Sequence, residues 1–153
     1  MIEVYTGEPG ACKTTALARK AKQCLIENER VHQNTGYMKK VYSNIRFSPE
    51  LHSRYPQYIQ YFDDLEDIDS LRNCDIFIDE VSLYFDAHNW EALPRRVKKF
   101  LRLLRHYGVN IYGASQDFKT VDPSFRRLVA KGHLYYFDRI VGTDEPNPAN
   151  PAA

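Results

Sequence analysis

The segment from Gly7 to Thr14 has residue types and spacing that suit the binding of phosphate. A phosphate-binding loop has the pattern G-x-x-x-x-G-K-[ST], preceded by a strand and followed by a helix. Its backbone N–H groups surround the phosphate oxygens, the helix N-terminus adds positive charge, and the Lys reaches the β- and γ-phosphates. The segment therefore predicts Lys13 as a catalytic residue. The predicted nucleotide site consists of Gly7, Glu8, Pro9, Gly10, Ala11, Cys12, Lys13, Thr14 and Thr15.

One residue of the loop departs from the pattern, because Cys12 stands where a Gly is expected. A turn that caps a helix is therefore an alternative interpretation. The strand-like run Ile2–Thr6 before the loop, the glycine Gly10 inside it and the helix-forming residues after it favour phosphate binding. A side chain at Cys12 thickens the loop, so we expect reduced affinity, limited by the small size of Ala11 and Cys12.

An apolar run from Asp75 that ends in two acids supplies the second half of the predicted site. A buried strand would deliver Asp79 to Mg²⁺, which the Thr14 hydroxyl also binds, and Glu80 would polarise a water for attack on the γ-phosphate. The alternative is a buried strand that ends in two solvated acids. The loop upstream favours the first interpretation, which predicts Thr14 and Asp79 as metal ligands and Glu80 as a catalytic residue.

Polar and basic residues later in the chain are further candidates. Gln116 follows a predicted strand, where it would sense the γ-phosphate or orient water, and an ordinary loop residue is the equal alternative. Arg126 and Arg127 lie on the next predicted helix, where either would serve as an arginine finger for a neighbouring subunit, unless both lie on a solvated face. Another predicted helix has a basic face, which consists of Arg95, Lys98, Arg102 and Arg105. This face either contacts DNA phosphates or is simply exposed to solvent.

The composition is that of a soluble globular domain. The chain has 153 residues, of which 43% are hydrophobic and 27% charged, and its net charge is +1. Nucleic-acid binding would therefore depend on local clusters of charge. The three cysteines lack metal-ligand spacing, which favours reduced thiols in a cytosolic protein. No secretory leader is recognised, and no apolar run reaches the ~20 residues that span a bilayer.

Predicted strands and helices alternate along the chain, which indicates an α/β fold of the P-loop NTPase type. Such alternation gives a central, mostly parallel sheet, here of about five strands, with helices on both faces. Ligands bind beyond the carboxyl ends of such strands, where all three parts of the predicted site fall. We expect an ATPase domain over residues 1–140 and a disordered tail or linker over 141–153. The predicted strands are Ile2–Thr6, Val41–Ile45, Asp75–Asp79, Asn110–Ser115 and His133–Phe137, and the main helices are Thr14–Glu29, Leu93–Tyr107 and Asp122–Ala130.

With these pieces assembled, the chain resembles the zonula occludens toxin (Zot-like) family of filamentous-phage assembly P-loop ATPases, of the FtsK/HerA class. The resemblance covers roughly residues 1–137, and the family usually has Gly-Lys-Thr where this chain has Cys12-Lys13-Thr14. Membrane-anchored members continue into a transmembrane helix and a second domain, and no such anchor is expected by Ala153. The motifs that carry the resemblance are Tyr5–Thr14, Tyr42–Ile45, Ile78–Glu80, Leu104–Gly108, Ala114–Gln116 and Val121–Arg126.

The resemblance implies an ATP hydrolase with ATP and Mg²⁺ as its cofactors. By analogy with the family, it implies a homo-oligomer in the form of a ring. This oligomer would act on DNA, single-stranded by preference, together with phage or viral assembly proteins. The activity would serve virion assembly, DNA export or genome packaging in the host cytoplasm, or at the inner membrane face in a longer parent protein. A nucleotide-binding assembly factor with little or no turnover is the alternative that Cys12 keeps open, and a small P-loop kinase is a third, for which no acceptor pocket or lid is recognised.

Overall fold

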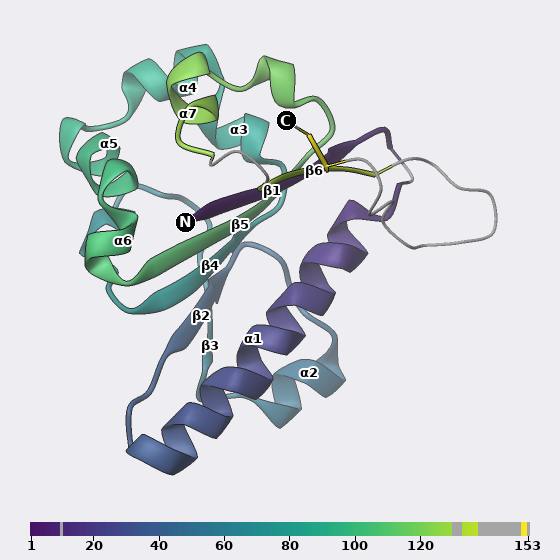
Figure 1. Cartoon of the computed structure of the whole chain (residues 1–153), viewed down its shortest axis with the longest axis vertical. Coiled ribbons are helices and arrows are strands. Elements are labelled where there is room, and N and C mark those ends of the chain that lie inside the picture. Colours follow the sequence, from purple (N-terminus) through teal and green to yellow (C-terminus); the bar gives the residue numbers. More distant parts are fainter. Residues whose placement is uncertain (10, 130–132, 138–150, 153) are drawn as a thin grey trace.

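The computed structural model describes residues 1–9, 11–129, 133–137 and 151–152, and a seven-stranded sheet forms the centre of this part (Figure 1). The strand order is β3-β2-β4-β5-β1-β6-β7. The ladders that join β3 through β6 are parallel, and β7 pairs antiparallel with β6. The strands are β1 (Ile2–Gly7), β2 (Lys40–Ser43), β3 (Ile59–Tyr61), β4 (Cys74–Ile78), β5 (Val109–Ser115), β6 (Leu134–Phe137) and β7 (Pro151–Ala152).

The central strands are apolar because helices cover both faces of the sheet. All five residues of β4 are buried. Successive side chains of a strand point to opposite faces, so Ile76 and Ile78 of β4 pack in one core while Phe77 packs in the other. The sheet therefore divides the molecule into two hydrophobic cores, one on each side.

One face is covered by the long helix α1 (Lys13–Thr35) and the short helix α2 (Pro49–Arg54). Leu17, Ala21 and Leu25 recur every four residues along α1 and are fully buried against the sheet. Gly36 ends the helix in a left-handed conformation with φ 75°. The direction of α1 matters for function, because its first residue, Lys13, belongs to the loop that follows β1.

In the part of the chain that the structure describes, five short helices cover the other face (Figure 1). Aromatic rings from three of these helices form a cluster in the core beneath them. Phe85 and Phe125 stack with ring centroids 4.2 Å apart, and Trp90 meets both at 6.2 Å. This packing brings the helix after β5 onto the helices after β4. The helices are α3 (Val81–Phe85), α4 (Ala87–Ala92), α5 (Arg95–Arg102), α6 (Leu104–Tyr107) and α7 (Pro123–Arg126).

The fold class predicted from the sequence is confirmed: the protein has the P-loop NTPase fold, and its parallel sheet includes all five predicted strands. Two short strands, β3 and β7, were not predicted. The predicted helix 93–107 begins at Arg95 and is interrupted at Leu103, where φ is −113° and ψ is 20°. The predicted helix 122–130 is shorter, since α7 ends at Arg126 and residue 130 lies outside the described residues.

The domain division at residue 140 stays a prediction. Within the segment 141–153, the described residues are Pro151 and Ala152, which form β7 beside β6. Among the helices of the described part of the chain, none is long and apolar enough to cross a membrane.

Candidate nucleotide site

The carboxyl ends of three neighbouring strands meet at one edge of the sheet. β4, β5 and β1 lie side by side and run in the same direction. The predicted phosphate loop therefore follows β1 at the same edge where Asp79 and Glu80 follow β4 and Gln116 follows β5. This edge is the place where ligands of open parallel sheets bind.

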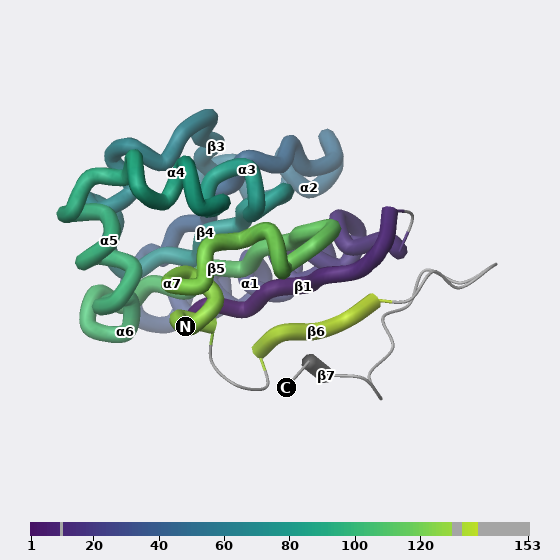
Figure 2. Tube along the Cα trace, turned by 90° about the horizontal axis from the view of Figure 1, so that it is seen from above, coloured from purple at the N-terminus to yellow at the C-terminus, as the bar shows by residue number. Residues whose placement is uncertain are grey.

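Gly7, at the end of β1, is required by close packing against the neighbouring strand. Its φ is 154°, and a Cβ atom at this position would overlap the carbonyl oxygen of Phe137 in β6. Figure 2 shows β6 lying along β1, in register from Val4 opposite Leu134 to Gly7 opposite Phe137. The first glycine of the motif therefore fixes where the chain leaves the sheet and turns into the loop.

The Lys13 side chain lies inside the loop and is only 7% exposed. Its Nζ donates hydrogen bonds to the carbonyl oxygens of Gly7 at 2.7 Å and Glu8 at 2.8 Å. Burial lowers the pKa of this amine, while the negative charges of Glu80 and Asp79 act in the opposite direction. A cation is thus held within the turn of the loop, at the point where a phosphate-binding loop needs one.

Cys12 has the backbone conformation that glycine adopts most easily. It precedes α1 with φ 60° and ψ 33°, in the left-handed region. For a residue with a Cβ atom this conformation costs roughly 1–2 kcal/mol. Glu80 is also left-handed, with φ 54° and ψ 61°, and it precedes α3. Backbone strain in folded proteins concentrates at functional sites, and two strained residues here flank the same edge of the sheet.

Thr14 and Asp79 lie in contact although 65 residues separate them in sequence. The Thr14 hydroxyl donates to Oδ2 of Asp79 at 3.2 Å, and the Thr14 side chain is exposed. A hydroxyl and a carboxylate are oxygen donors of the kind that Mg²⁺ prefers, and Mg²⁺ is usually held by one or two such groups together with phosphates and water. No cluster of three His, Cys, Asp or Glu residues that could hold a metal by itself exists among the described residues. The donor set therefore fits a Mg²⁺ ion shared with phosphates.

Asn44, which follows β2, holds the backbone of Asp79 in place. Its Oδ1 accepts a hydrogen bond from Asp79 N–H at 2.7 Å, and its Nδ2 donates to Asp79 C=O at 3.1 Å and to the Tyr84 hydroxyl at 3.2 Å. Asn44 lies within the motif Tyr42–Ile45, and no role was predicted for it from the sequence. The signal that could have indicated a role is its position near the end of a predicted strand, at the edge of the sheet where the site was expected.

The comparisons with known proteins agree with this geometry. The model of the family described as Zonular occludens toxin (Zot) matches residues 1–147. The chain belongs to the Zot family. Its structure is similar to that of the N-terminal domain of zonular occludens toxin from Neisseria meningitidis, with TM-score 0.60 and 21% identity, over 88% of this chain and 75% of that one. Among curated protein sequences, none matches significantly.

Other solved structures share the fold of this Zot-family chain. The DNA-packaging ATPase B204 from Sulfolobus Turreted Icosahedral Virus is 13% identical, with TM-score 0.59, over 89% of this chain and 74% of that one. The cytoplasmic domain of EssC is 13% identical, with TM-score 0.52, over 89% of this chain and 31% of that one. At such low identity the likeness establishes the P-loop NTPase fold.

The remaining candidate residues of the Zot-family chain take no part in the contact between Thr14 and Asp79. Gln116 is exposed directly after β5. Arg126 and Arg127 lie at the end of α7, and Arg127 Nε donates to the carbonyl oxygen of Pro123 at 3.2 Å. Within the described part of the chain, no hydrogen bond or ion pair joins these three side chains to the loop or to Asp79. Their roles stay predictions.

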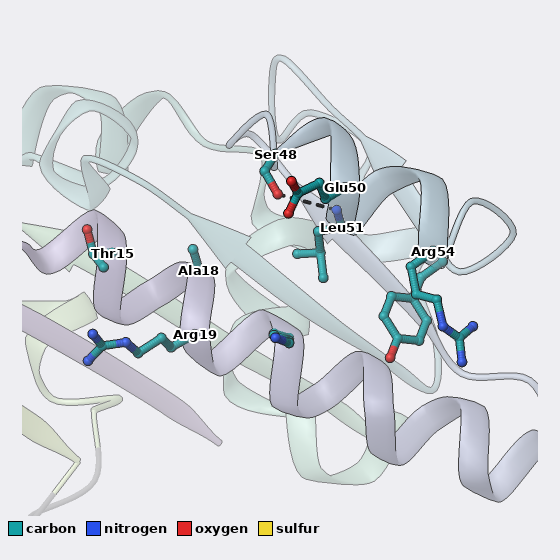
Figure 3. Close-up of a pocket in the computed structure, with 9 residues that line it drawn as sticks. Thr15, Ala18, Arg19, Ser48, Glu50, Leu51 and Arg54 are labelled. Carbon is teal, nitrogen blue, oxygen red and sulfur yellow. Dashed lines mark hydrogen bonds between the residues drawn. The ribbon is translucent and has the colours of Figure 1, made fainter.

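Thr15 lines a separate hollow between α1 and α2 (Figure 3). The hollow measures about 370 Å³. On the α1 side it is bordered by Arg19 and Lys22, which are exposed. The predicted contact of Thr15 with the nucleotide thus stays a prediction, because the structure places this side chain in the hollow beside the loop. The other lining residues are Ala18, Ser48, Glu50, Leu51, Arg54 and Tyr55.

Proposed function

We propose that this Zot-family protein is a Mg²⁺-dependent ATPase that works in phage assembly or genome packaging. The observation that carries the proposal is the contact between Thr14 and Asp79. It brings the residue after the loop lysine within 3.2 Å of the acid that ends β4. These are the two protein groups that a P-loop NTPase uses to hold its metal ion. A helix-capping turn, the alternative interpretation of the loop, gives no reason for this contact.

Each residue of the proposed site has a distinct task. Lys13 and the backbone N–H groups at the start of α1 would hold the β- and γ-phosphates. Thr14 and Asp79 would hold Mg²⁺, which when bound neutralises charge that develops on the phosphate oxygens. Glu80 would accept a proton from the attacking water. The left-handed backbone of Glu80 turns the chain sharply after β4, so Glu80 occupies the same edge as Lys13, whose pKa its charge influences.

The solved structures that share the fold support a nucleotide as the ligand. Structures of the genome packaging NTPase B204 from Sulfolobus turreted icosahedral virus 2 contain AMP or AMPPCP, each at 14% identity and TM-score 0.59. Such packaging enzymes, and the Zot family itself, also support DNA and assembly proteins as partners. We propose further that the protein acts as a homo-oligomer, with Arg126 or Arg127 reaching a neighbouring subunit's site, in the cytoplasm of the host cell.

Cys12 favours a second candidate, a nucleotide-binding assembly factor with little turnover. A Cβ and sulfur in the left-handed residue of the loop occupy space that a glycine leaves to the phosphates. The two candidates share nucleotide binding and differ in hydrolysis, so the rate of phosphate release separates them.

The deciding experiment measures phosphate release from ATP by the full chain, together with binding of a fluorescent ATP analogue. Lys13→Ala should lower turnover at least about 100-fold, and Glu80→Gln about 100-fold or more with binding retained. Chelation of Mg²⁺ should abolish turnover. Lys22→Ala and Glu91→Gln change exposed residues of the same types and should have no effect. Turnover in Lys13→Ala at the unmodified rate would reject the site. Nucleotide binding without turnover in the unmodified chain would select the second candidate.

A further inference from the structure

Five cationic side chains of α5 surround one hollow on the face of the molecule opposite α1. The hollow measures about 580 Å³, and among the described residues only Lys and Arg side chains line it. The chain as a whole carries a net charge of only +1, so this is a strong local concentration of positive charge. The lining residues are Arg95, Arg96, Lys98, Lys99 and Arg102. We propose that this basic hollow binds the phosphate backbone of a DNA strand.

The two cations at the start of α5 are not explained by the stability of the helix. The apolar residues Val97, Phe100 and Leu101 are buried and provide its packing. Arg95 and Arg96 stand in the first turn, where the helix dipole disfavours positive charge. Pro94, the residue before the helix, supplies no side-chain cap. Cations at this position weaken the isolated helix, whereas Lys99 and Arg102 stand in the last turn, where the dipole favours positive charge. The stability of the helix therefore accounts for the cations at its end and not for those at its start.

Most of the positive charge is not neutralised within the protein. Arg96 pairs with Asp69 at 3.4 Å and more weakly with Asp67 at 3.9 Å. Lys98 lies over the ring of Trp90. The side chains of Arg95, Lys99 and Arg102 are exposed, and none of the three pairs with a carboxylate in the part of the chain that the structure describes. Three cations therefore remain available to a ligand.

The spacing of the cations suits a strand of phosphates. Residues three, four and seven apart share one face of a helix, which places Arg95, Lys99 and Arg102 on the same side. Seven residues of helix extend about 10 Å. This length equals roughly three steps between successive phosphates of one strand, each of which rises about 3.4 Å along the duplex axis. A charged groove that follows the backbone is the usual means of sequence-independent binding to nucleic acid.

A membrane surface is the other polyanion to consider, and the packing of α5 argues against it. A helix that lies in a membrane interface inserts its apolar face among the lipids. Here that face is inside the core, and within the described ranges of the chain no apolar side chain lines the basic hollow. The structure thus presents charge alone, which binds phosphates by release of counterions.

The basic hollow lies away from the candidate nucleotide site. α5 sits near the end of the sheet where β1 begins, whereas the phosphate loop follows the opposite end of β1 (Figure 1). The inference rests on the proposed function in one respect, since it names the surface through which a packaging or assembly ATPase holds DNA. Binding of DNA at α5 can nevertheless be measured without nucleotide.

The test uses the full chain, without nucleotide, and a fluorescein-labelled oligo-dT or a duplex of the same length, followed by anisotropy over a range of salt concentrations. Lys99→Glu/Arg102→Glu should weaken binding to either DNA about tenfold or more and lower the salt slope by roughly 1.4 for oligo-dT and roughly 1.8 for the duplex. The matched control is Arg19→Glu/Lys22→Glu, with the same charge change and spacing in the hollow beside α1. It should retain the affinity of the unmodified chain.

The outcomes separate this inference from the proposed function. An unchanged affinity in the α5 variant, or an equal loss in the α1 control, would overturn the inference even if ATP is hydrolysed. Binding of the unmodified chain to phosphatidylglycerol vesicles but not to DNA would overturn it as well. A selective loss in the α5 variant would support it whether or not Lys13→Ala changes turnover. Circular dichroism and basal turnover should match between the α5 variant and the unmodified chain, which excludes misfolding.

Discussion

The side-chain amide of Asn44 hydrogen-bonds both main-chain polar groups of Asp79, the N–H at 2.7 Å and the C=O at 3.1 Å. Asp79 directly follows β4, before the chain turns sharply at Glu80, and its carboxylate faces Thr14. The amide of Asn44 therefore acts in place of a neighbouring strand at a point where the sheet has already ended. The position of the predicted metal ligand Asp79 therefore depends on a residue that follows a different strand.

Asn44→Ala should lower turnover about tenfold or more and raise the Mg²⁺ concentration needed for half-maximal rate, because loss of supporting contacts around a metal ligand typically costs 10–100-fold. Asn110→Ala is the matched control, since Asn110 donates to Asp75 at the other end of β4. Both changes should destabilise the fold by about 1–2 kcal/mol. Equal effects of the two changes on the Mg²⁺ dependence would show that Asn44 has only a structural role.

Cys12→Gly should stabilise the folded protein by about 1 kcal/mol, because glycine adopts the left-handed conformation without the penalty of a Cβ atom. We also expect tighter binding of a fluorescent ATP analogue, since the loop becomes slimmer. Thermal unfolding and a binding titration measure the two effects. Cys12→Ala removes the sulfur but keeps the strained backbone. A gain in Cys12→Ala as large as in Cys12→Gly would mean that the thiol, and not the backbone, limits the loop.

Alkaline pH should destabilise the protein through its buried thiols. Burial raises the pKa of Cys24 and of Cys74 from 9.0 to about 12. Between these values the unfolded chain loses protons that the folded chain keeps, so the free energy of unfolding falls as pH rises from about 9 to 12. Burial also raises the pKa of Tyr5 and Tyr112, which adds to the effect at higher pH. Urea unfolding at pH 8 to 11 measures the trend.

The Cys74→Val variant should show a shallower fall in stability over the same pH range, because one of the two thiols no longer ionises on unfolding. Cys74 is fully buried in β4, and Val has a similar shape, so the variant should fold. A pH dependence identical to that of the unmodified chain would contradict the assignment to Cys74.

Gly7→Ala should cost about 1–3 kcal/mol of stability, because the new methyl group overlaps the Phe137 carbonyl and forces β6 away from β1. We expect nucleotide binding to be lost along with the strand contact, since the loop begins at this residue. Gly36→Ala is the control: Gly36 is also at positive φ, but no atom lies within 4 Å of a Cβ there. If both variants lose equal stability and both keep nucleotide binding, the contact with β6 is not what requires glycine.

The sequence was sufficient to predict the strands and helices whose apolar residues run continuously or recur at regular spacing. The apolar run through Ile76 and Ile78 predicted β4, and the apolar positions of α1 predicted the long helix. β3 was missed because Ile59–Tyr61 is only three residues long and lies in a Tyr-rich, acidic connector. Its formation depends on pairing with β2, which is a tertiary contact. The break at Leu103 likewise has no Gly or Pro to mark it.

The candidate site was predictable where a motif fixes both residue type and spacing. Lys13, Thr14 and Asp79 were found in this way, and the structure brings all three to one edge of the sheet. Asn44 was not assigned a role, because its bonds to the Asp79 backbone cross 35 residues of sequence and depend on the order of the strands. Residues that act across a subunit boundary, as proposed for Arg126, depend on a neighbouring molecule and lie beyond what one chain specifies.

The position of β1 in the sheet has a consequence for the order in which the molecule is made. Among the strands that the structure describes, β1 is synthesised before its two neighbours, β5 and β6, which come much later in the chain. During translation the predicted phosphate loop therefore emerges before these neighbours, and Gly7 gains its contact with Phe137 only after β6 has been made. Nascent chains should be unable to retain nucleotide until β6 has left the ribosome. The predicted pocket starts at β1 and is completed only when β6 has paired with it, so we expect ATP binding to require both strands.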